Sequence, residues 1–302
     1  MVDIIGKKRF FFLFSALVII PGLVSLLLFG LRLSIDFTGG TLMEFRIKSA
    51  KSVSREEIGK IFSGEGAEVA SIQQSGENTY LLKMKPIGQE QKEKIESALR
   101  EKTGEVEELR FETVGSVISR ELTQKAIWAL GLALLAIVIY VAWAFRQVPK
   151  PASSWRFGVC AVAALVHDVL VVVGIFSLLG HFYHVEIDTL FITAILTVIG
   201  FSVHDTIVVF DRIRENLRKM PNDSFKEVVN ESILQTLTRS INTSLTVVFV
   251  LLALLLMGGG SLRWFVTALL AGVISGTYSS IFNASPLLVV WQEWSQKRSS
   301  KS

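Results

Sequence analysis

The stretch GFSVHDTIVVFDRIREN, from Gly200 to Asn216, places His204 and Asp205 side by side inside an otherwise apolar run. Asp205 precedes Asp211 by six residues, which is roughly 9 Å along a helix. An aspartate at the centre of a membrane helix costs ~2.5–3.5 kcal/mol on insertion scales. Removal from water also favours the protonated form of a carboxyl group. The sequence therefore predicts that Asp205 is retained to load and release protons.

The composition indicates a chain that lies largely in lipid. Half of the 302 residues are hydrophobic and 19% are charged, whereas soluble domains are about 25% charged. Six apolar runs approach the ~20 residues that cross a bilayer. These runs are Phe10–Gly30, Ala126–Phe145, Phe157–Leu179, Thr189–Phe210, Ile241–Met257 and Trp264–Val290. We therefore expect a polytopic α-helical membrane protein with six transmembrane helices.

The first apolar run is predicted to be a retained span, because no small-residue cleavage site follows it. The single cysteine, Cys160, excludes an intrachain disulfide. The net charge of +4 does not indicate a nucleic-acid partner, since Lys and Arg gather at the ends of the spans.

The cationic clusters predict the orientation of the chain. They precede the first span, separate the second from the third, and follow the fourth and the sixth, whereas the other two short loops are nearly free of Lys and Arg. The clustered residues are Lys7, Lys8, Arg9, Arg146, Lys150, Arg156, Arg212, Arg214, Arg218, Lys219, Lys226, Lys297, Arg298 and Lys301. By the positive-inside rule both termini are cytoplasmic and the segment 31–124 lies outside.

The outside segment is long enough for a small domain. TLMEFRIK, AEVASIQQS, TYLLKMK and EVEELRFETV are typical of strands, whereas REEIGKIF and GQEQKEKIESALREKTG are typical of helices. Ser54 and Glu57 form a capping-box signal for the first helix. The order β-α-β-β-α-β predicts an extracytoplasmic α+β ferredoxin-like domain between the first two spans.

The chain is thus expected to have four parts. These are a cytoplasmic N-terminus and first span (1–30), the ferredoxin-like domain (31–124), a five-helix bundle (125–292) and a cytoplasmic tail (293–302). Within the bundle, the segment 211–239 is broken at Pro221 and restarts at a capping box of Ser224 and Glu227. Its apolar residues recur at helical spacing, which predicts a short amphipathic helix on the cytoplasmic membrane face.

Polar and small residues repeat along the predicted spans. The stripes are Ala268, Gly272, Gly276 and Ser280 in span six; Thr193, Thr197, Gly200 and His204 in span four; Arg239, Asn242 or Thr243, and Thr246 in span five. Span three carries the pair His167 and Asp168. Small residues let helices approach closely, and polar groups in a membrane usually face the bundle interior. We therefore expect these stripes to face one another.

A proton relay through the bundle follows from this arrangement. Arg239 is expected to reach toward Asp205, and His204 and His167 could extend the relay. Polar groups can also act only as interhelical hydrogen-bond partners. This purely structural role stays open for His167, Asp168, Asn242 and Asn283.

No other site chemistry finds comparable support. His181 and His184 have H-x-x-H spacing but lack a third ligand, so no metal site is expected. The sequence carries no catalytic motif and no cofactor motif. The segment DFTGG, which includes Asp36, Phe37, Gly39 and Gly40, is expected to turn the chain from span one into the first strand.

Three motifs carry a resemblance to a known family. SIDFTGGTLMEF, ILTVIGFSVHDTIVVFDRIRENL and LTRSINTSLT, in this order and around six spans, resemble the SecF family of the bacterial SecD–SecF protein-export complex. That family belongs to the resistance-nodulation-division (RND) superfamily. The resemblance implies a subunit without enzyme activity that uses the proton-motive force, together with SecD, to draw translocating polypeptide outward.

The resemblance also assigns residues and partners. Asp205 matches the essential aspartate of span four, and Arg239 matches the arginine that begins span five. His204 stands where asparagine is common, and Ser116 where proline is usual. The implied partners are SecD, the Sec translocon with further accessory subunits, translocating polypeptide and membrane lipids. The implied location is the bacterial cytoplasmic (inner) membrane.

Two other functions remain open from the sequence. One is an RND-type exporter of small molecules or lipids, although such chains often have twelve spans. The other is a structural scaffold of a membrane assembly. Loss of activity on replacement of Asp205 separates the proton-driven reading from the scaffold.

Overall fold

The computed structural model describes residues 3–48, 53–76, 78–146, 149, 153–259 and 262–299. The chain divides into two compact units. The first is a helical bundle of Met1–Arg32 and Trp128–Ser302, and the second is a sheet domain of Leu33–Ile127. Each unit has a hydrophobic core of its own.

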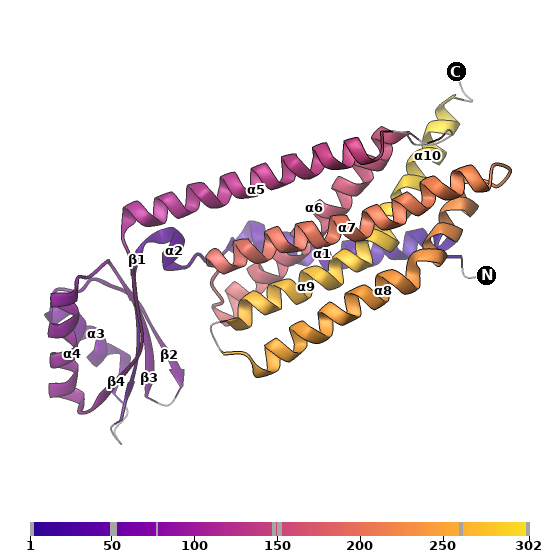
Figure 1. Ribbon diagram of the computed structural model, residues 1–302. Coiled ribbons are helices and arrows are strands. Elements are labelled where there is room, and N and C mark those ends of the chain that lie inside the picture. Colours follow the sequence, from indigo (N-terminus) through magenta and orange to yellow (C-terminus); the bar gives the residue numbers. More distant parts are fainter. Residues whose placement is uncertain are drawn as a thin grey trace. The chain divides into compact units, whose positions relative to one another are not determined.

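Six helical segments of the described chain are long and apolar enough to cross a membrane, as predicted. Figure 1 shows helices of the bundle running alongside one another. The elements are a short 3-10 turn η1 (Ile5–Lys7), α1 (Lys8–Phe29), α5 (Ser116–Ala144), α6 (Ser154–Tyr183), α7 (Thr189–Lys219), α8 (Phe225–Met257), α9 (Arg263–Ser279), a π-helical segment η3 (Ser280–Ala284) and α10 (Ser285–Ser299). The sixth helical segment thus extends past the start of the predicted tail at residue 293.

Polar side chains cap the starts of α7 and α8, the two helices that are joined at Asp205. The Asp188 carboxylate accepts a hydrogen bond from the Phe191 amide at 2.9 Å and so caps α7. Ser224 and Glu227 form the expected capping box at the start of α8. Between them α7 runs without a break through Gly200, His204 and Asp205.

The prediction of a separate amphipathic helix within 211–239 is wrong. Residues up to Lys219 belong to α7, and residues from Phe225 onward form one continuous helix with the fifth span. The apolar face of this stretch, Val228, Val229 and Ile233, is buried in the core of the bundle. The apolar periodicity was real, but the protein interior buries it rather than the lipid surface.

The centre of the bundle consists of α6, α7 and α9, in which half or more of the apolar window is buried. In contrast, α5 leaves most of its apolar side chains exposed. It enters the bundle core through Val141, and Phe145 just beyond its end packs on Phe157 and Phe210. Apolar side chains exposed along a membrane-length helix are suited to lipid or to another membrane helix.

The sheet domain has the predicted ferredoxin-like topology. Its elements are α2 (Ile35–Thr38), β1 (Gly40–Ile47), α3 (Arg55–Gly64), β2 (Val69–Gly76), β3 (Thr79–Met84), α4 (Gln89–Thr103) and β4 (Val106–Val114). The strand order is β2-β3-β1-β4, and all neighbours are antiparallel. One sheet face, with Met43, Phe45 and Leu82, packs on Ile58 of α3 and Ile95 of α4.

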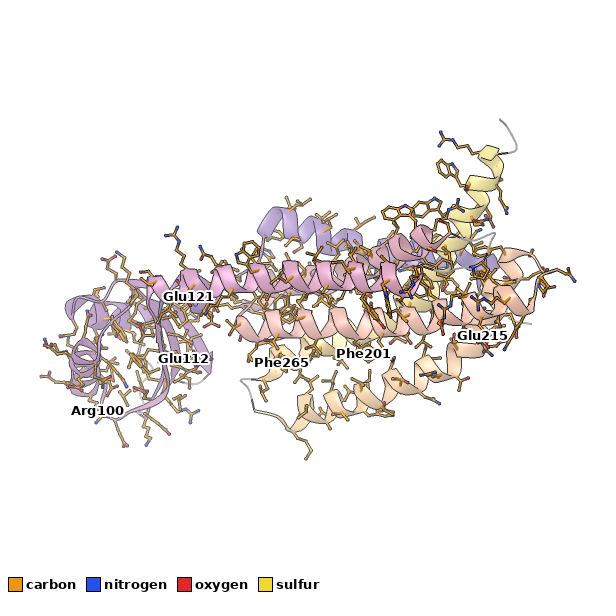
Figure 2. All side chains as sticks on the ribbon, turned by 45° about the horizontal axis from the view of Figure 1, so that its top comes forward. Arg100, Glu112, Glu121, Phe201, Glu215 and Phe265 are labelled. Carbon is orange, nitrogen blue, oxygen red and sulfur yellow. The ribbon has the colours of Figure 1, made fainter. Side chains whose placement is uncertain are left out.

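The distribution of side chains differs between the two units. Figure 2 shows Arg100 and Glu112 among the many charged side chains of the sheet domain. In the bundle, the labelled residues Phe201 and Phe265 lie along α7 and α9, and Glu215 lies near the end of α7. The charges of α7 therefore gather at its C-terminal end, beyond the apolar run.

Candidate functional site

Asp205 lies inside the bundle on the side of α7 that faces α8. Its side chain is buried, and Oδ1 accepts a hydrogen bond from Ser240 Oγ at 2.6 Å. Its Oδ2 is buried and has no hydrogen-bond partner in the described part of the chain. An unpaired carboxylate oxygen away from water is costly. Oδ2 is therefore the position at which this group can take a proton.

Arg239 is not the residue of α8 that meets Asp205. Ser240 occupies the inward position, whereas Arg239, Asn242 and Thr243 lie on exposed faces of α8. Among the described residues, no ion pair joins Arg239 to Asp205. Successive helix residues are about 100° apart, so Ser240, and not Arg239, makes the direct hydrogen bond to the carboxylate. Only the packing of α8 against α7 decides which of the two neighbours points inward.

Asp168 of α6 is a second carboxylate in the bundle, and it is saturated with donors. Its side chain is 1% exposed. Oδ1 accepts a hydrogen bond from Ser275 at 2.6 Å, and Oδ2 accepts hydrogen bonds from Ser202 and Ser279 at the same distance. His167 Nδ1 lies 3.0 Å from Oδ1. These four partners come from three helices, so Asp168 ties α6, α7 and α9 together.

His167 contacts Asp168 through one ring nitrogen and leaves the other ring nitrogen without a partner among the described residues. If Nδ1 carries the proton toward Asp168, Nε2 is left as an acceptor, and Nε2 is buried without a partner among the described residues. The ring is nearly parallel to that of Tyr278, with 6.3 Å between the centroids. His167 thus contacts both Asp168 and the Tyr278 ring inside the bundle.

A set of hydroxyl groups surrounds the two carboxylates. Thr206 bonds Ser280 at 2.7 Å between α7 and the π-helical segment, and Ser244 bonds Thr277 at 2.5 Å between α8 and α9. Ser202, which binds Asp168, lies three residues before Asp205 on α7. Single π-helical turns are frequent at functional sites. The hydroxyls form two groups: Ser280 donates to the Ser202 carbonyl at 3.4 Å on the Asp168 side, and Ser244 donates to the Ser240 carbonyl at 2.9 Å on the Asp205 side.

The glycines of the sixth span fit the expected close packing, whereas those of the fourth do not. A Cβ on Gly272 would lie 2.1 Å from Val198 Cγ2, and a Cβ on Gly276 would lie 3.1 Å from Ser202 Cβ. Gly200 is exposed, and a Cβ there would meet no atom within 4 Å. Thr197 is also exposed and bonds the Thr193 carbonyl of its own helix. Thr197 and Gly200 are therefore not packing residues of this chain.

His204 shares the exposed face of α7 with Thr197 and Gly200. It points away from the buried side of the helix, which carries Asp205 and Thr206. The prediction that the polar stripes of spans four and five face one another inside the bundle is therefore wrong. Both stripes lie on the outside of the chain.

The DFTGG segment forms a compact turn within the sheet domain. Ser34 caps the single helical turn α2, which contains Asp36 and Phe37. Gly39 has φ +70° and Gly40 has φ +132°, both in the range that favours glycine. A Cβ on Gly40 would also lie 2.9 Å from the Met84 carbonyl oxygen. The two glycines are required by the backbone that leads into β1.

His181 and His184 are engaged in other contacts. His181 stacks on Phe29 with 3.7 Å between the centroids, and His184 Nδ1 contacts the Arg32 guanidinium. The positively charged guanidinium of Arg32 would repel a metal cation at His184.

The serines that bind the two acids were not singled out from the sequence. Ser202, Ser240, Ser275 and Ser279 are all buried. A signal existed in span six, because Ser275 and Ser279 are one helical turn apart on the face adjoining the glycine stripe. Serine is common in membrane helices, so this spacing identifies a donor only when an acceptor is known.

Comparison with known proteins agrees with this arrangement. Residues 94–294 match the family model described as protein export membrane protein SecD/SecF, C-terminal. Residues 24–51, which contain the DFTGG turn, match the SecD/SecF GG motif. The family model of the bundle thus covers well over half of the chain.

Named relatives span the whole chain. It is 49% identical to the protein translocase subunit SecF of Thermobaculum terrenum, covering 97% of this chain and 94% of that protein. It is 35% identical to the SecDF subunit of Bacillus subtilis, of which it covers 39%. A crystal structure of SecDF from Thermus, a translocon-associated membrane protein, matches with a TM-score of 0.82 and 36% identity, over 97% of this chain and 39% of that one. The chain belongs to the SecD/SecF family of protein-export membrane proteins.

Proposed function

We propose that this chain is a proton-driven subunit of a protein-export complex that promotes late steps of export with a SecD-like partner. Support comes from relatives named as protein translocase subunits at 49% and 44% identity. The proposal requires no bond-making chemistry on the exported polypeptide. Proton movement through the bundle supplies the free energy, and the sheet domain is the part that acts on the polypeptide or on the partner.

The observation that carries the proposal is the incomplete bonding of Asp205. Its Oδ1 accepts a hydrogen bond from Ser240 of α8, and its Oδ2 has no hydrogen-bond partner among the described residues. Loss of the proton creates a buried charge that one hydroxyl cannot stabilise. Arg239 adjoins Ser240 on α8, so a rotation of α8 by the angle of one residue, about 100°, would bring the guanidinium to the carboxylate. Proton loading would thus be coupled to the position of α8.

We infer that the sheet domain lies outside the cytoplasm. The start of α1, the end of α7 and the start of α8 lie at one end of the bundle, as Asn230 Oδ1 accepts from the Ile4 amide and Lys226 pairs with Asp3. That end carries the cationic clusters, and cationic loops favour the cytoplasmic side. A bacterial inner membrane with both termini cytoplasmic is the proposed location.

The partner is proposed to cover the exposed polar stripes. His204 on α7, together with Arg239, Asn242 and Thr243 on α8, is exposed along membrane-length helices. Polar groups facing lipid are costly, so a second bundle is expected against them. Two relatives of this chain are SecDF proteins in which it matches 39% of the length, which leaves room for a SecD-like half. Contacts with the translocon and further subunits are part of the same proposal.

The test replaces Asp205 in the complex and measures export into membrane vesicles with an imposed proton-motive force. We expect Asp205→Asn to abolish the proton-dependent acceleration of export and Asp205→Glu to retain part of it, because only the carboxyl groups exchange protons. The matched control is Asp223→Asn, since Asp223 is exposed in the α7–α8 connection. Both variants should insert and co-purify with the partner as wild type does. Export at the wild-type rate by Asp205→Asn would leave the scaffold as the better reading.

A further inference from the structure

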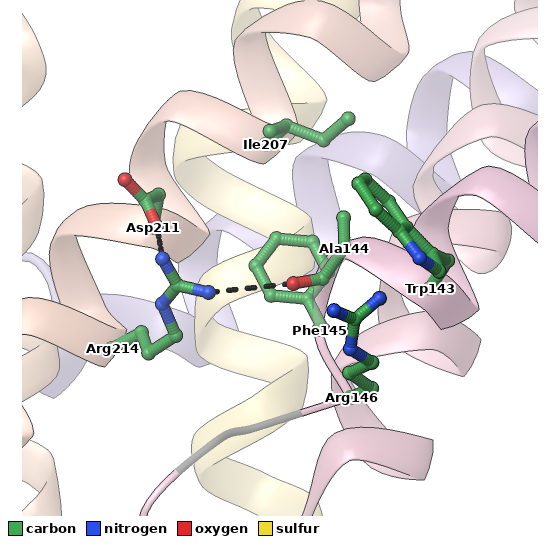
Figure 3. Close-up of a pocket in the computed structure, with 7 residues that line it drawn as sticks. All are labelled: Trp143, Ala144, Phe145, Arg146, Ile207, Asp211 and Arg214. Carbon is green, nitrogen blue, oxygen red and sulfur yellow. Dashed lines mark hydrogen bonds and ion pairs between the residues drawn. The ribbon is translucent and has the colours of Figure 1, made fainter.

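A pocket of about 310 Å³ opens on the bundle where α5 ends and α7 leaves its apolar run (Figure 3). Its lining residues are Trp143, Ala144, Phe145, Arg146, Ile207, Asp211 and Arg214. Figure 3 shows Trp143 and Arg146 on one side, and Asp211 with Arg214 on the other. The relay through Asp205 does not use these residues.

One of the two arginines that line the pocket has a carboxylate partner among the described residues, and the other does not. Arg214 pairs with Asp211 at 2.6 Å and also donates to the Ala144 carbonyl at 3.3 Å. The Arg146 guanidinium lies 4.8 Å from the centre of the Trp143 ring, and it has no carboxylate partner among the described residues. Two guanidinium groups and one carboxylate leave one positive charge, which is carried by Arg146.

The position of the pocket at the ends of two apolar helices indicates which part of a membrane surrounds it. The apolar run of the second span ends at Phe145 and that of the fourth at Phe210, so Arg146 and Asp211 directly follow the two runs. The ends of membrane-length apolar helices lie at the boundary of the hydrocarbon, where Trp and Arg are characteristic residues. Lipid phosphate groups occupy this level of a bilayer.

We propose that the pocket binds the phosphate group of one membrane phospholipid. Arg146 donates to the phosphate oxygens, because its planar guanidinium suits two oxygens of one phosphate. Trp143 and Ile207 contact the glycerol and upper acyl carbons. Asp211 opposes further negative charge, so a singly charged phosphodiester fits better than a phosphate monoester. The proposal stands apart from the export function, since it requires only that the bundle lies in a membrane.

Native mass spectrometry of the full-length chain in detergent tests the assignment. The probes are phosphatidylglycerol as the lipid and glycerol 3-phosphate as the soluble phosphate. We expect one tightly held phosphatidylglycerol in the wild type and about fivefold weaker binding in Arg146→Gln, the effect of one cation near a lipid surface. Arg9→Gln is the matched control, because Arg9 is an exposed cation at the start of α1 and does not line the pocket. Asp211→Asn should tighten the binding.

Three outcomes would overturn the proposal. Equal losses in Arg146→Gln and Arg9→Gln would indicate diffuse surface charge. Binding of glycerol 3-phosphate in place of the lipid would make the site one for a soluble phosphate. Unchanged lipid binding with weaker co-purification of a partner protein would make it a protein contact. Arg146→Lys keeps the charge, so its lipid binding and its melting temperature show whether a loss in Arg146→Gln reflects misfolding.

Discussion

At the scale of single residues, two aspartates in one apolar bundle have opposite surroundings. Asp168 receives three serine hydroxyls and a histidine nitrogen, whereas Asp205 receives one hydroxyl. Both are buried. A saturated carboxylate stabilises the helices that donate to it, whereas the proposed proton exchange depends on the unpartnered oxygen of Asp205. The proposed division of roles between the two acids thus rests on the number of donors and not on burial.

Asp168→Asn should destabilise the bundle more than Asp205→Asn does. An asparagine amide would present N–H groups to hydroxyls that now donate, so one or more buried partners would lose their bonds, at about 1–3 kcal/mol each. The same change at Asp205 removes a single hydroxyl bond at most. Thermal unfolding of the purified variants measures the difference. Equal melting temperatures for the two variants would contradict the clamp assigned to Asp168.

At the scale of elements, the contact between α7 and α9 depends on missing side chains. Gly272 and Gly276 lie against Val198 and Ser202, so the two helix backbones approach closely. Ser202 also binds Asp168, and Ser275 and Ser279 do so from α9. Close packing and the buried hydrogen bonds are therefore parts of the same contact. By comparison, α8 leaves most of its apolar window exposed, which is consistent with its proposed movement.

Gly272→Ala should destabilise the α7–α9 contact, because its Cβ would overlap Val198. Overpacking of this kind costs typically about 1–3 kcal/mol. The matched control is Gly200→Ala, which has open space around its Cβ and lies within a helix, where alanine is favoured by roughly 0.5–1 kcal/mol. Thermal unfolding should thus move in opposite directions for the two variants. Val198→Ala should partly restore Gly272→Ala, and no restoration would place the cause elsewhere.

At the scale of the whole molecule, the bundle and the sheet domain have separate cores. In the sheet domain, Lys92 of α4 pairs with Glu108 of β4 at 2.8 Å and lies 3.5 Å from Glu96. Burial and a hydrogen bond to Glu108 raise the pKa of Glu96. Burial raises the pKa of Glu108, but the hydrogen bonds with Lys92 and Glu96 lower it by more. The pKa of Glu108 is therefore below its ordinary value. The two neighbouring carboxyl groups therefore have pKa values shifted in opposite directions beside the same lysine.

The stability of the sheet domain should consequently depend on pH. Because the pKa of Glu96 is raised, its contribution to stability is present at low pH and is lost as the pH rises through that raised pKa. Because the pKa of Glu108 is lowered, its contribution is present at higher pH and is lost as the pH falls through that lowered pKa. We expect Glu96→Gln to flatten the loss toward neutral pH, an effect below about 1 kcal/mol for partly exposed groups. Glu93→Gln, on the same helix and exposed, is the control.

The measurement is denaturant unfolding of the full chain in detergent at several pH values, with a probe in each unit. Only the unfolding transition of the sheet domain should move with pH, since the bundle core contains none of Lys92, Glu96 and Glu108. A parallel shift of both transitions in wild type and Glu96→Gln would contradict the assignment.

The sequence by itself determined the six membrane-length helices and the order of the ferredoxin-like elements, and it predicted a role for Asp205. These features depend on local or periodic signals: apolar length, alternation, capping residues and the cost of a charge in lipid. Gly39 and Gly40 were also assigned to a turn from local chemistry. The same kind of signal predicted an amphipathic face at Val228 and Ile233, but it could not distinguish lipid from protein as the covering surface.

Only the tertiary structure decided which polar residues meet. Whether Ser240 or Arg239 points at Asp205 depends on the rotation of α8 about its own axis, and adjacent residues differ by about 100°. The serine donors of Asp168 come from positions 34 to 111 residues away along the chain. Helical periodicity fixes which residues of one helix share a face, but the direction of that face is set by packing against other helices. For this reason the sequence identified the acid, and the packing of the bundle selected its partners.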